Sequence, residues 1–255
     1  MRKLTYTFLL YCLCVSLYAQ YSIQDTDGVL NKKEAASLEQ IIAYQLEFYN
    51  KVLPESSIKP TDVRLNIYSN YSAYLMYQKE QMKTTLHRSM GFYSSKNKEA
   101  VVCKDKHEKE FLSTCYHELS HFFVNTYFGS VPIWLNEGIA VYFGNMKPGK
   151  SVNHQVVKTY ILRVKTMIDL RDIDLNDFLS WNRNKFYERS FSHESYGYAL
   201  GYSIVQYLMQ KDEKSVVSLI REIKNGKDSK EAIDIVYEGG FSSFEKDFME
   251  YINKY

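Results

Sequence analysis

Cysteine is scarce in this chain. The 255 residues include four cysteines, and Cys12 and Cys14 fall within an apolar run near the N-terminus. Cys103 and Cys115 are the two that remain, too few for a fold built on disulfides. They could form one bridge or stay as two thiols. Either way, we expect the fold to rest on its hydrophobic core.

An excess of charge of one sign is also lacking. The chain has 32 Lys and Arg against 30 Asp and Glu, and Arg2 and Lys3 account for the whole difference because no acidic residue precedes Gln20. The rest of the chain is formally neutral, so nothing in its charge favours binding to nucleic acid or to an anionic membrane. Low-complexity tracts and internal repeats are absent as well.

The one long apolar run lies at the N-terminus. Residues 4–18 are mostly apolar, follow Met-Arg-Lys and precede Ala19. This order of a basic segment, an apolar segment and a small residue is typical of a secretory signal peptide. An uncleaved membrane anchor is the alternative, but the run is shorter than the roughly 20 residues that a spanning helix needs. We therefore expect cleavage after residue 19, a secreted or periplasmic mature protein, and no stable membrane association.

Hydrophobic periodicity predicts one α+β domain over residues 20–255. Residues 20–129 should form a small mixed sheet packed on a helix, and residues 130–255 a mostly helical lobe. We expect residues 20–31 to be a weakly ordered lead-in, and the acidic stretch 172–177 to be a connection or a helix cap. Helical spacing covers residues 32–52, 71–82, 108–128, 132–143, 152–168, 196–210, 214–224, 230–237 and 241–252, and strand patterns cover 63–68, 91–93 and 100–103.

Two histidines four positions apart form the main chemical motif. His117-Glu118-Leu119-Ser120-His121 is an H-E-x-x-H sequence. On a helix, four residues advance by about 400°, or about 40° net, so both imidazoles lie on one face and can bind one metal ion. Glu118 lies about 100° round the helix from His117, where it can reach a water on the metal without being a ligand. Two surface histidines are the alternative, but the apolar neighbours of the motif favour a buried helix.

A catalytic zinc site needs a third protein ligand and an open position for water. Glu137 supplies it on the next predicted helix, sixteen positions after His121. Two antiparallel helices joined by a short turn bring it level with the two histidines. Taken alone, Glu137 could instead be a solvated carboxylate at the start of a helix.

Both strings resemble those of the gluzincin metallopeptidases, most closely the short peptidase-MA-like families. The strings are His-Glu-Leu-Ser-His and Trp-Leu-Asn-Glu-Gly-Ile-Ala, and the aminopeptidase N family shares them. The resemblance implies a minimal thermolysin-like catalytic domain with one Zn²⁺ per chain, held by His117, His121 and Glu137, with Glu118 as general base. It also implies that the tyrosine of Tyr198-Ala-Leu-Gly stabilises the oxyanion of the transition state. Tyr196 and His193 are the alternatives for that role.

The sequence departs from the aminopeptidases in two places. The gap between His121 and Glu137 is shorter than expected, so the connecting turn must be tight. The candidate edge strand, Gly91-Phe-Tyr-Ser-Ser, carries no carboxylate to hold the free amine of a substrate. We therefore expect internal cleavage of peptides or proteins. The backbone of residues 91–93 could pair with an extended substrate, although a buried hairpin is equally natural.

Two other functions stay open. The chain could be a zinc-binding interaction module without turnover, or a zinc hydrolase of a non-peptide amide or ester. Glu118 argues against the module, because a structural zinc site closes its fourth position and has no use for a base. The oligomeric state stays open as well.

Overall fold

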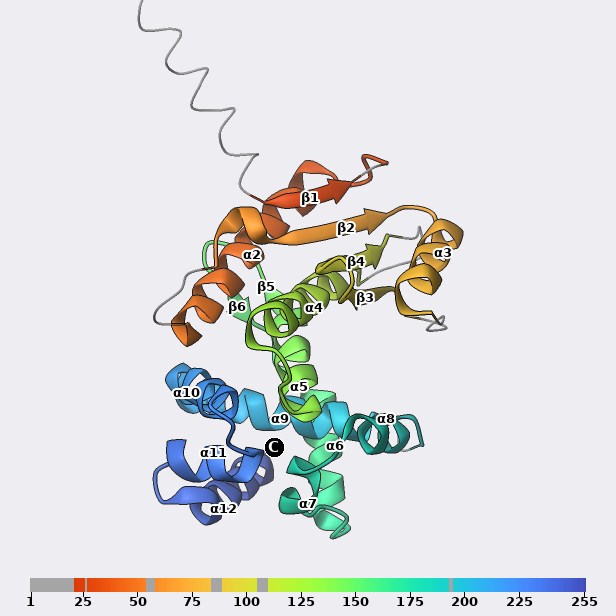
Figure 1. Ribbon diagram of the computed structural model, residues 1–255. Helices are drawn as coiled ribbons and strands as arrows, with labels where there is room; N and C mark the ends of the chain where they lie inside the picture. Colours follow the sequence, from red (N-terminus) through yellow and green to blue (C-terminus); the bar gives the residue numbers. More distant parts are fainter. Residues whose placement is uncertain (1–20, 26, 54–57, 84–88, 105–109, 193–194) are drawn as a thin grey trace, which may run out of the picture.

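The computed structural model describes residues 21–25, 27–53, 58–83, 89–104, 110–192 and 195–255. The predicted signal peptide and His193 lie outside these residues. Sheet and helices segregate along the molecule, with the strands at one end and most of the later helices at the other (Figure 1). This arrangement confirms the predicted α+β class, in which a small mixed sheet precedes a helical C-terminal part.

The sheet has the strand order β1-β2-β4-β3. Strands β1, β2 and β4 are parallel, and β3 is antiparallel to β4 at one end of the sheet. The prediction that residues 20–31 are weakly ordered was wrong at Ser22–Asp25, which form strand β1. The segment is short and polar, and its side chains alternate only between exposed and half-buried, so its strand pattern is faint in the sequence. The strands are β1 (Ser22–Asp25), β2 (Arg64–Tyr68), β3 (Gly91–Ser94) and β4 (Glu99–Cys103).

Helices cover both faces of the sheet. On one face lie α2 (Lys32–Val52) and α4 (Phe111–Phe123), and on the other α3 (Tyr71–Met82). Successive side chains of β4 alternate between these faces, as a pleated strand requires, so Val102 joins the core under α4 while Cys103 joins the cluster under α3. Cys115 packs in the core under α4, on the other face of the sheet from Cys103, and the two form no disulfide with each other. The fold therefore rests on packing, without a bridge between them.

Helix α4, which carries the H-E-x-x-H sequence, is held against α2 by buried polar contacts. The hydroxyls of Tyr49 and Ser120 are 2.6 Å apart, and Gln45 Nε2 donates to the carbonyl of Tyr116 at 2.8 Å. Such bonds lie out of reach of water, where breaking one costs the full desolvation of the group left behind. They fix the rotation of α4 about its axis and hence the direction in which its histidines point.

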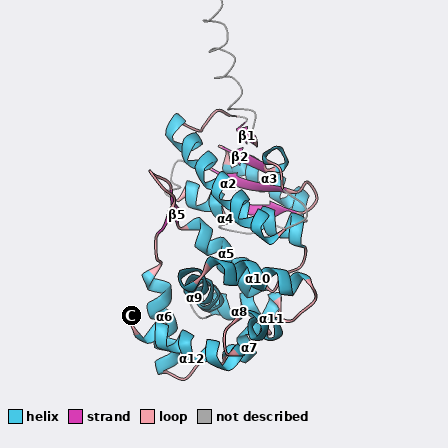
Figure 2. Cartoon of the chain, turned by 90° about the vertical axis from the view of Figure 1, so that its left-hand side faces the viewer, coloured by secondary structure: helices cyan, strands magenta, loops and turns pink. Residues whose placement is uncertain are grey.

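The C-terminal part is helical, with one two-stranded ribbon (Figure 2). The helix predicted over residues 152–168 was wrong at its start. Asn153–His154 pairs with Met146–Lys147 in the ribbon, so the helix begins only at Lys158. Two helices in the polar stretch before Tyr196 were not predicted. The elements are α5 (Ile133–Gly144), β5 (Met146–Lys147), β6 (Asn153–His154), α6 (Lys158–Asp169), α7 (Leu175–Leu179), α8 (Arg183–Ser192), α9 (Tyr196–Lys211), α10 (Glu213–Lys224), α11 (Ser229–Val236) and α12 (Gly240–Asn253).

Glycines allow α5 and α9 to cross in backbone contact. A Cβ atom on Gly138 would lie 2.5 Å from the carbonyl oxygen of Gly201, and one on Gly201 would lie 2.6 Å from that of Trp134. Only glycine permits so close an approach. The crossing brings Glu137 on α5 next to the first turns of α9, where Tyr198 lies. Within the part of the chain that the structure describes, no helix is both long and apolar enough to span a membrane.

Candidate metal centre

Helix α4 carries His117 and His121 on consecutive turns. The apolar residues between and around them, including Leu119 and Phe122, are buried in the core. The helix continues as a wider turn over Val124–Phe128 and ends at Gly129, whose φ of +76° is a conformation that glycine adopts readily. This tight ending reverses the chain, so that α5 returns beside α4.

Helix α5 is buried along its whole length. Glu137 lies in its second turn and is only 4% exposed, which excludes the alternative of a solvated carboxylate at a helix start. A buried carboxylate must have polar or charged partners. The two histidines of α4 supply them.

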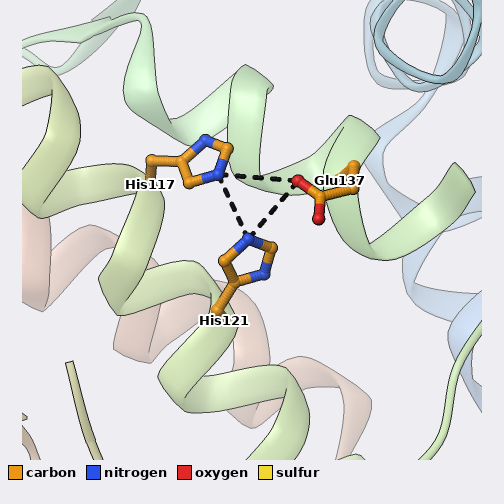
Figure 3. A group of neighbouring side chains, drawn as sticks. All are labelled: His117, His121 and Glu137. Carbon is orange, nitrogen blue, oxygen red and sulfur yellow. Dashed lines mark hydrogen bonds and ion pairs between the residues drawn. The ribbon is translucent and has the colours of Figure 1, made fainter. Parts of the chain in front are cut away.

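Three ligand atoms converge between α4 and α5 (Figure 3). The Nε2 atoms of His117 and His121 are 3.1 Å apart, and Oε2 of Glu137 lies 3.6 and 3.5 Å from them, respectively. Tetrahedral zinc with bonds of about 2.0–2.1 Å separates its ligand atoms by about 3.3 Å. The three atoms therefore match the spacing of one face of a zinc tetrahedron, with the fourth corner open.

Neighbouring side chains orient two of the three ligands. Asn136 Oδ1 lies 3.1 Å from His121 Nδ1 and accepts a hydrogen bond from it, which leaves Nε2 as the ring nitrogen that faces the candidate metal position. The hydroxyl of Tyr187 donates to Oε1 of Glu137 at 2.8 Å, which leaves Oε2 facing the histidines. No pattern in the sequence singles out Tyr187, because helix α8 was not predicted and the contact spans 50 positions.

The charges of Glu137 and the two histidines strongly influence one another's pKa values. Burial alone would lower the pKa of His121, but the Glu137 carboxylate outweighs burial and raises it to about 9. Burial would likewise raise the pKa of Glu137, but the two imidazoles hold it well below its usual range. Glu137 is thus ionised and ready to bind a cation.

Glu118 lies beside the three candidate ligands and lines the same cavity as they do. It is 7% exposed, and its Oε2 has no hydrogen-bond partner among the described residues. Burial raises the pKa of this carboxyl, while His117 and His121 partly oppose the rise. Gly91 covers Glu118 so closely that a Cβ there would lie 2.5 Å from the Glu118 Cγ. A buried carboxylate with one free oxygen and a raised pKa has the properties of a general base.

These groups open into a cavity of about 710 Å³. Tyr198 lines it, and burial together with the charge of Glu137 raises the pKa of this phenol above its usual range, so the hydroxyl keeps its proton. Tyr196 instead stacks on Trp181 and donates its hydroxyl to the carbonyl of Asp172. The structure thus brings Tyr198 to the cavity and engages Tyr196 elsewhere. The lining also includes Gly91, Phe92, Tyr93, Lys98, Asn125, Asn136, Arg183 and Tyr187.

A comparison with models of known protein families agrees with this geometry. The family model described as the Peptidase MA superfamily matches residues 96–254, which include both ligand-bearing helices and the helical C-terminal part. A comparison with curated proteins finds no match.

Proposed function

Because the chain belongs to the peptidase MA superfamily, whose model matches more than half of its length, we propose that it is a zinc-dependent peptidase that cleaves within extended peptide or protein chains. The superfamily is typically zinc-dependent. The observation that carries the proposal is the convergence of His117, His121 and Glu137 beside the free carboxylate oxygen of Glu118.

The donor set fits one zinc ion per chain. Two imidazole nitrogens and one carboxylate oxygen are common ligands of catalytic zinc, and three protein ligands leave a position open. When bound there, zinc polarises a substrate carbonyl and lowers the pKa of a water molecule to about 7. His117, His121 and Glu137 would hold the ion.

Glu118 moves the protons of the reaction. As the water oxygen adds to the carbonyl carbon, Glu118 accepts the water proton and then delivers it to the nitrogen when the C–N bond breaks. Its raised pKa suits both steps, because the carboxyl must gain the proton and later release it. The hydroxyl of Tyr198 donates a hydrogen bond to the oxygen of the former carbonyl, where negative charge develops.

Strand β3 offers a place for an extended substrate. Cys103 N donates to Met90 O at 2.8 Å, so in this antiparallel pair the residues in register alternate between bonded and non-bonded positions. Gly91 and Tyr93 occupy non-bonded positions, and their backbone N–H and C=O groups therefore point away from β4. A peptide strand could add at this end of the sheet, beside the metal centre.

The cavity also favours internal cleavage over removal of an N-terminal residue. Among the described residues that line it, Glu118 and Glu137 are the two carboxylates, and both have roles in the proposed chemistry. Neither is then available to hold the free amine of an aminopeptidase substrate. We further propose that the protein acts outside the cytoplasm after loss of residues 1–19.

The proposal is tested by incubating residues 20–255 with a peptide library derived from a proteome and sequencing the new termini. We expect cleavage that stops with a chelator and returns with zinc. Glu118→Gln should still bind about one zinc per chain and lose hydrolysis, whereas Glu238→Gln, which alters an exposed carboxylate between α11 and α12, should behave as wild type.

Other outcomes support the alternative functions. Zinc binding without any peptide cleavage by the wild type would favour a hydrolase of a non-peptide amide or ester, or an interaction module. Unchanged cleavage by Glu118→Gln would contradict the proposed mechanism.

A further inference from the structure

The cavity carries positive charge that the proposed chemistry does not use. Lys98, in the turn between β3 and β4, and Arg183, the first residue of α8, both line it. Both side chains are exposed, and neither pairs with a carboxylate anywhere in the described residues. Because Glu118 and Glu137 are committed to the reaction and the metal, the charge left to meet a substrate is positive.

Arg183 stands close to the metal ligands. Its Cζ lies 5.8 Å from the centre of the Tyr187 ring, and the hydroxyl of that ring donates to Glu137 at 2.8 Å. Phe191 stacks on the same ring with centroids 6.2 Å apart. Arg183, Tyr187 and Phe191 thus follow one another along one face of α8, and a single side chain separates the guanidinium from a zinc ligand.

This position suits the recognition of an anion. A guanidinium is planar, always charged, and presents paired N–H donors that match the two oxygens of a carboxylate, while its face can rest on an aromatic ring. We propose that Arg183 binds a carboxylate of the peptide substrate. The carboxylate could be an Asp or Glu side chain near the scissile bond, or the C-terminus of the peptide. This inference rests on the proposed function, since it assigns a substrate preference to the same site.

A purely structural role for Arg183, in which it only packs on Tyr187, leads to a different result. Packing would contribute to the stability of α8 but would not distinguish a glutamate from a glutamine in the substrate. The discriminating quantity is therefore the ratio of kcat/KM for a Glu peptide to that for the matching Gln peptide. These side chains have the same shape and differ in charge.

The first arm measures this ratio at sites found in the peptide library. For wild type we expect about a tenfold preference for the carboxylate, reduced to about one in Arg183→Gln. Lys185→Gln is the matched control: it removes one charge from the same helix, at a residue paired with Asp177 at 2.8 Å, and should keep the preference. C-terminally amidated peptides identify the source of the preference: a fall in kcat/KM on amidation identifies the terminal carboxylate, and a fall on Glu-to-Gln exchange identifies the side chain.

The second arm separates this inference from the proposed function. Glu- and Gln-bearing peptide hydroxamates, together with their C-terminally amidated forms, are titrated into the zinc-loaded protein, so that binding is measured without turnover. Carboxylate-selective binding that depends on Arg183, in a protein that cleaves no peptide, would support the inference and overturn the peptidase. Cleavage with the same carboxylate preference in wild type and Arg183→Gln, or with none in either, would overturn the inference and leave the peptidase standing.

Discussion

The hydroxyl of Tyr187 provides a sharp test of how the metal centre is organised. It donates to Oε1 of Glu137, whose side chain is only 6% exposed, so water cannot readily replace the donor in Tyr187→Phe. Without the phenol the carboxylate is free to rotate and to pair with His121 through either oxygen. The site then loses the preorganisation that presents Oε2 to a metal.

The expected magnitude follows from this geometry. Loss of an outer partner of a metal ligand typically lowers metal affinity by about 10–100-fold, which corresponds to about 1.4–2.8 kcal/mol. The fold should persist, because the aromatic ring remains and keeps its contacts with Phe186, Phe191 and Tyr198 at centroid distances of 5.6, 6.2 and 6.4 Å.

Competition between the protein and a chromophoric chelator measures the zinc affinity directly, and Co²⁺ absorption reports the ligand geometry. Tyr198→Phe is the matched control: it removes a hydroxyl from the same cavity, and it should lower kcat while keeping zinc affinity near that of wild type. Zinc affinity of Tyr187→Phe within about twofold of wild type, against the decrease of at least tenfold expected for a lost outer partner, would refute the positioning role.

Three further predictions concern the proposed base Glu118, the crossing of α5 and α9, and the partly buried His154. Gly91→Ala places a Cβ 2.5 Å from Glu118 Cγ and should displace the carboxylate, so kcat should fall while zinc content stays constant. Unchanged kcat would show that catalysis does not depend on the precise position of Glu118. Gly138→Ala meets the carbonyl of Gly201 at 2.5 Å and should lower the free energy of unfolding by about 1–3 kcal/mol in urea titrations, whereas a wild-type midpoint would contradict the backbone contact. Burial lowers the pKa of His154 from 6.5 to about 4. Because the unfolded chain takes up this proton more readily, the stability that neutral His154 contributes is complete above about pH 6.5 and declines as the pH falls to about 4. Because the ring is partly exposed, the effect is limited to roughly 1–2 kcal/mol, and it should be missing in His154→Phe; equal pH dependence of the two proteins would count against it.

Local patterns predicted the elements that carry the metal centre. The H-E-x-x-H spacing requires only that α4 be helical, and its apolar neighbours already indicated a buried helix. Glu137 could be found because a three-ligand site demanded a partner and the next helix offered one carboxylate. The structure brings the three side chains together as a possible metal-binding group, with their candidate ligand atoms within 4.8 Å of one another.

What could not be predicted depends on long-range contacts. Helix α8 is mostly polar and many of its residues are exposed, so its helical period is hidden, and with it the bond from Tyr187 to Glu137. The place of β3 at the end of the sheet is a matter of strand order, which the alternation of side chains within one strand does not encode. Cys103 and Cys115 are likewise separated because they belong to hydrophobic clusters on opposite faces of the sheet, an arrangement that local sequence patterns do not encode.

The most direct measurement is an anomalous difference map, recorded at the zinc absorption edge, of crystals of residues 20–255 grown with zinc. We predict one peak per chain, about 2.0–2.2 Å from Nε2 of His117, Nε2 of His121 and an oxygen of Glu137, with Glu118 near the open position but not bonded to the ion. A zinc peak at other residues, or direct coordination by Glu118 in place of Glu137, would contradict the assignment of these four residues.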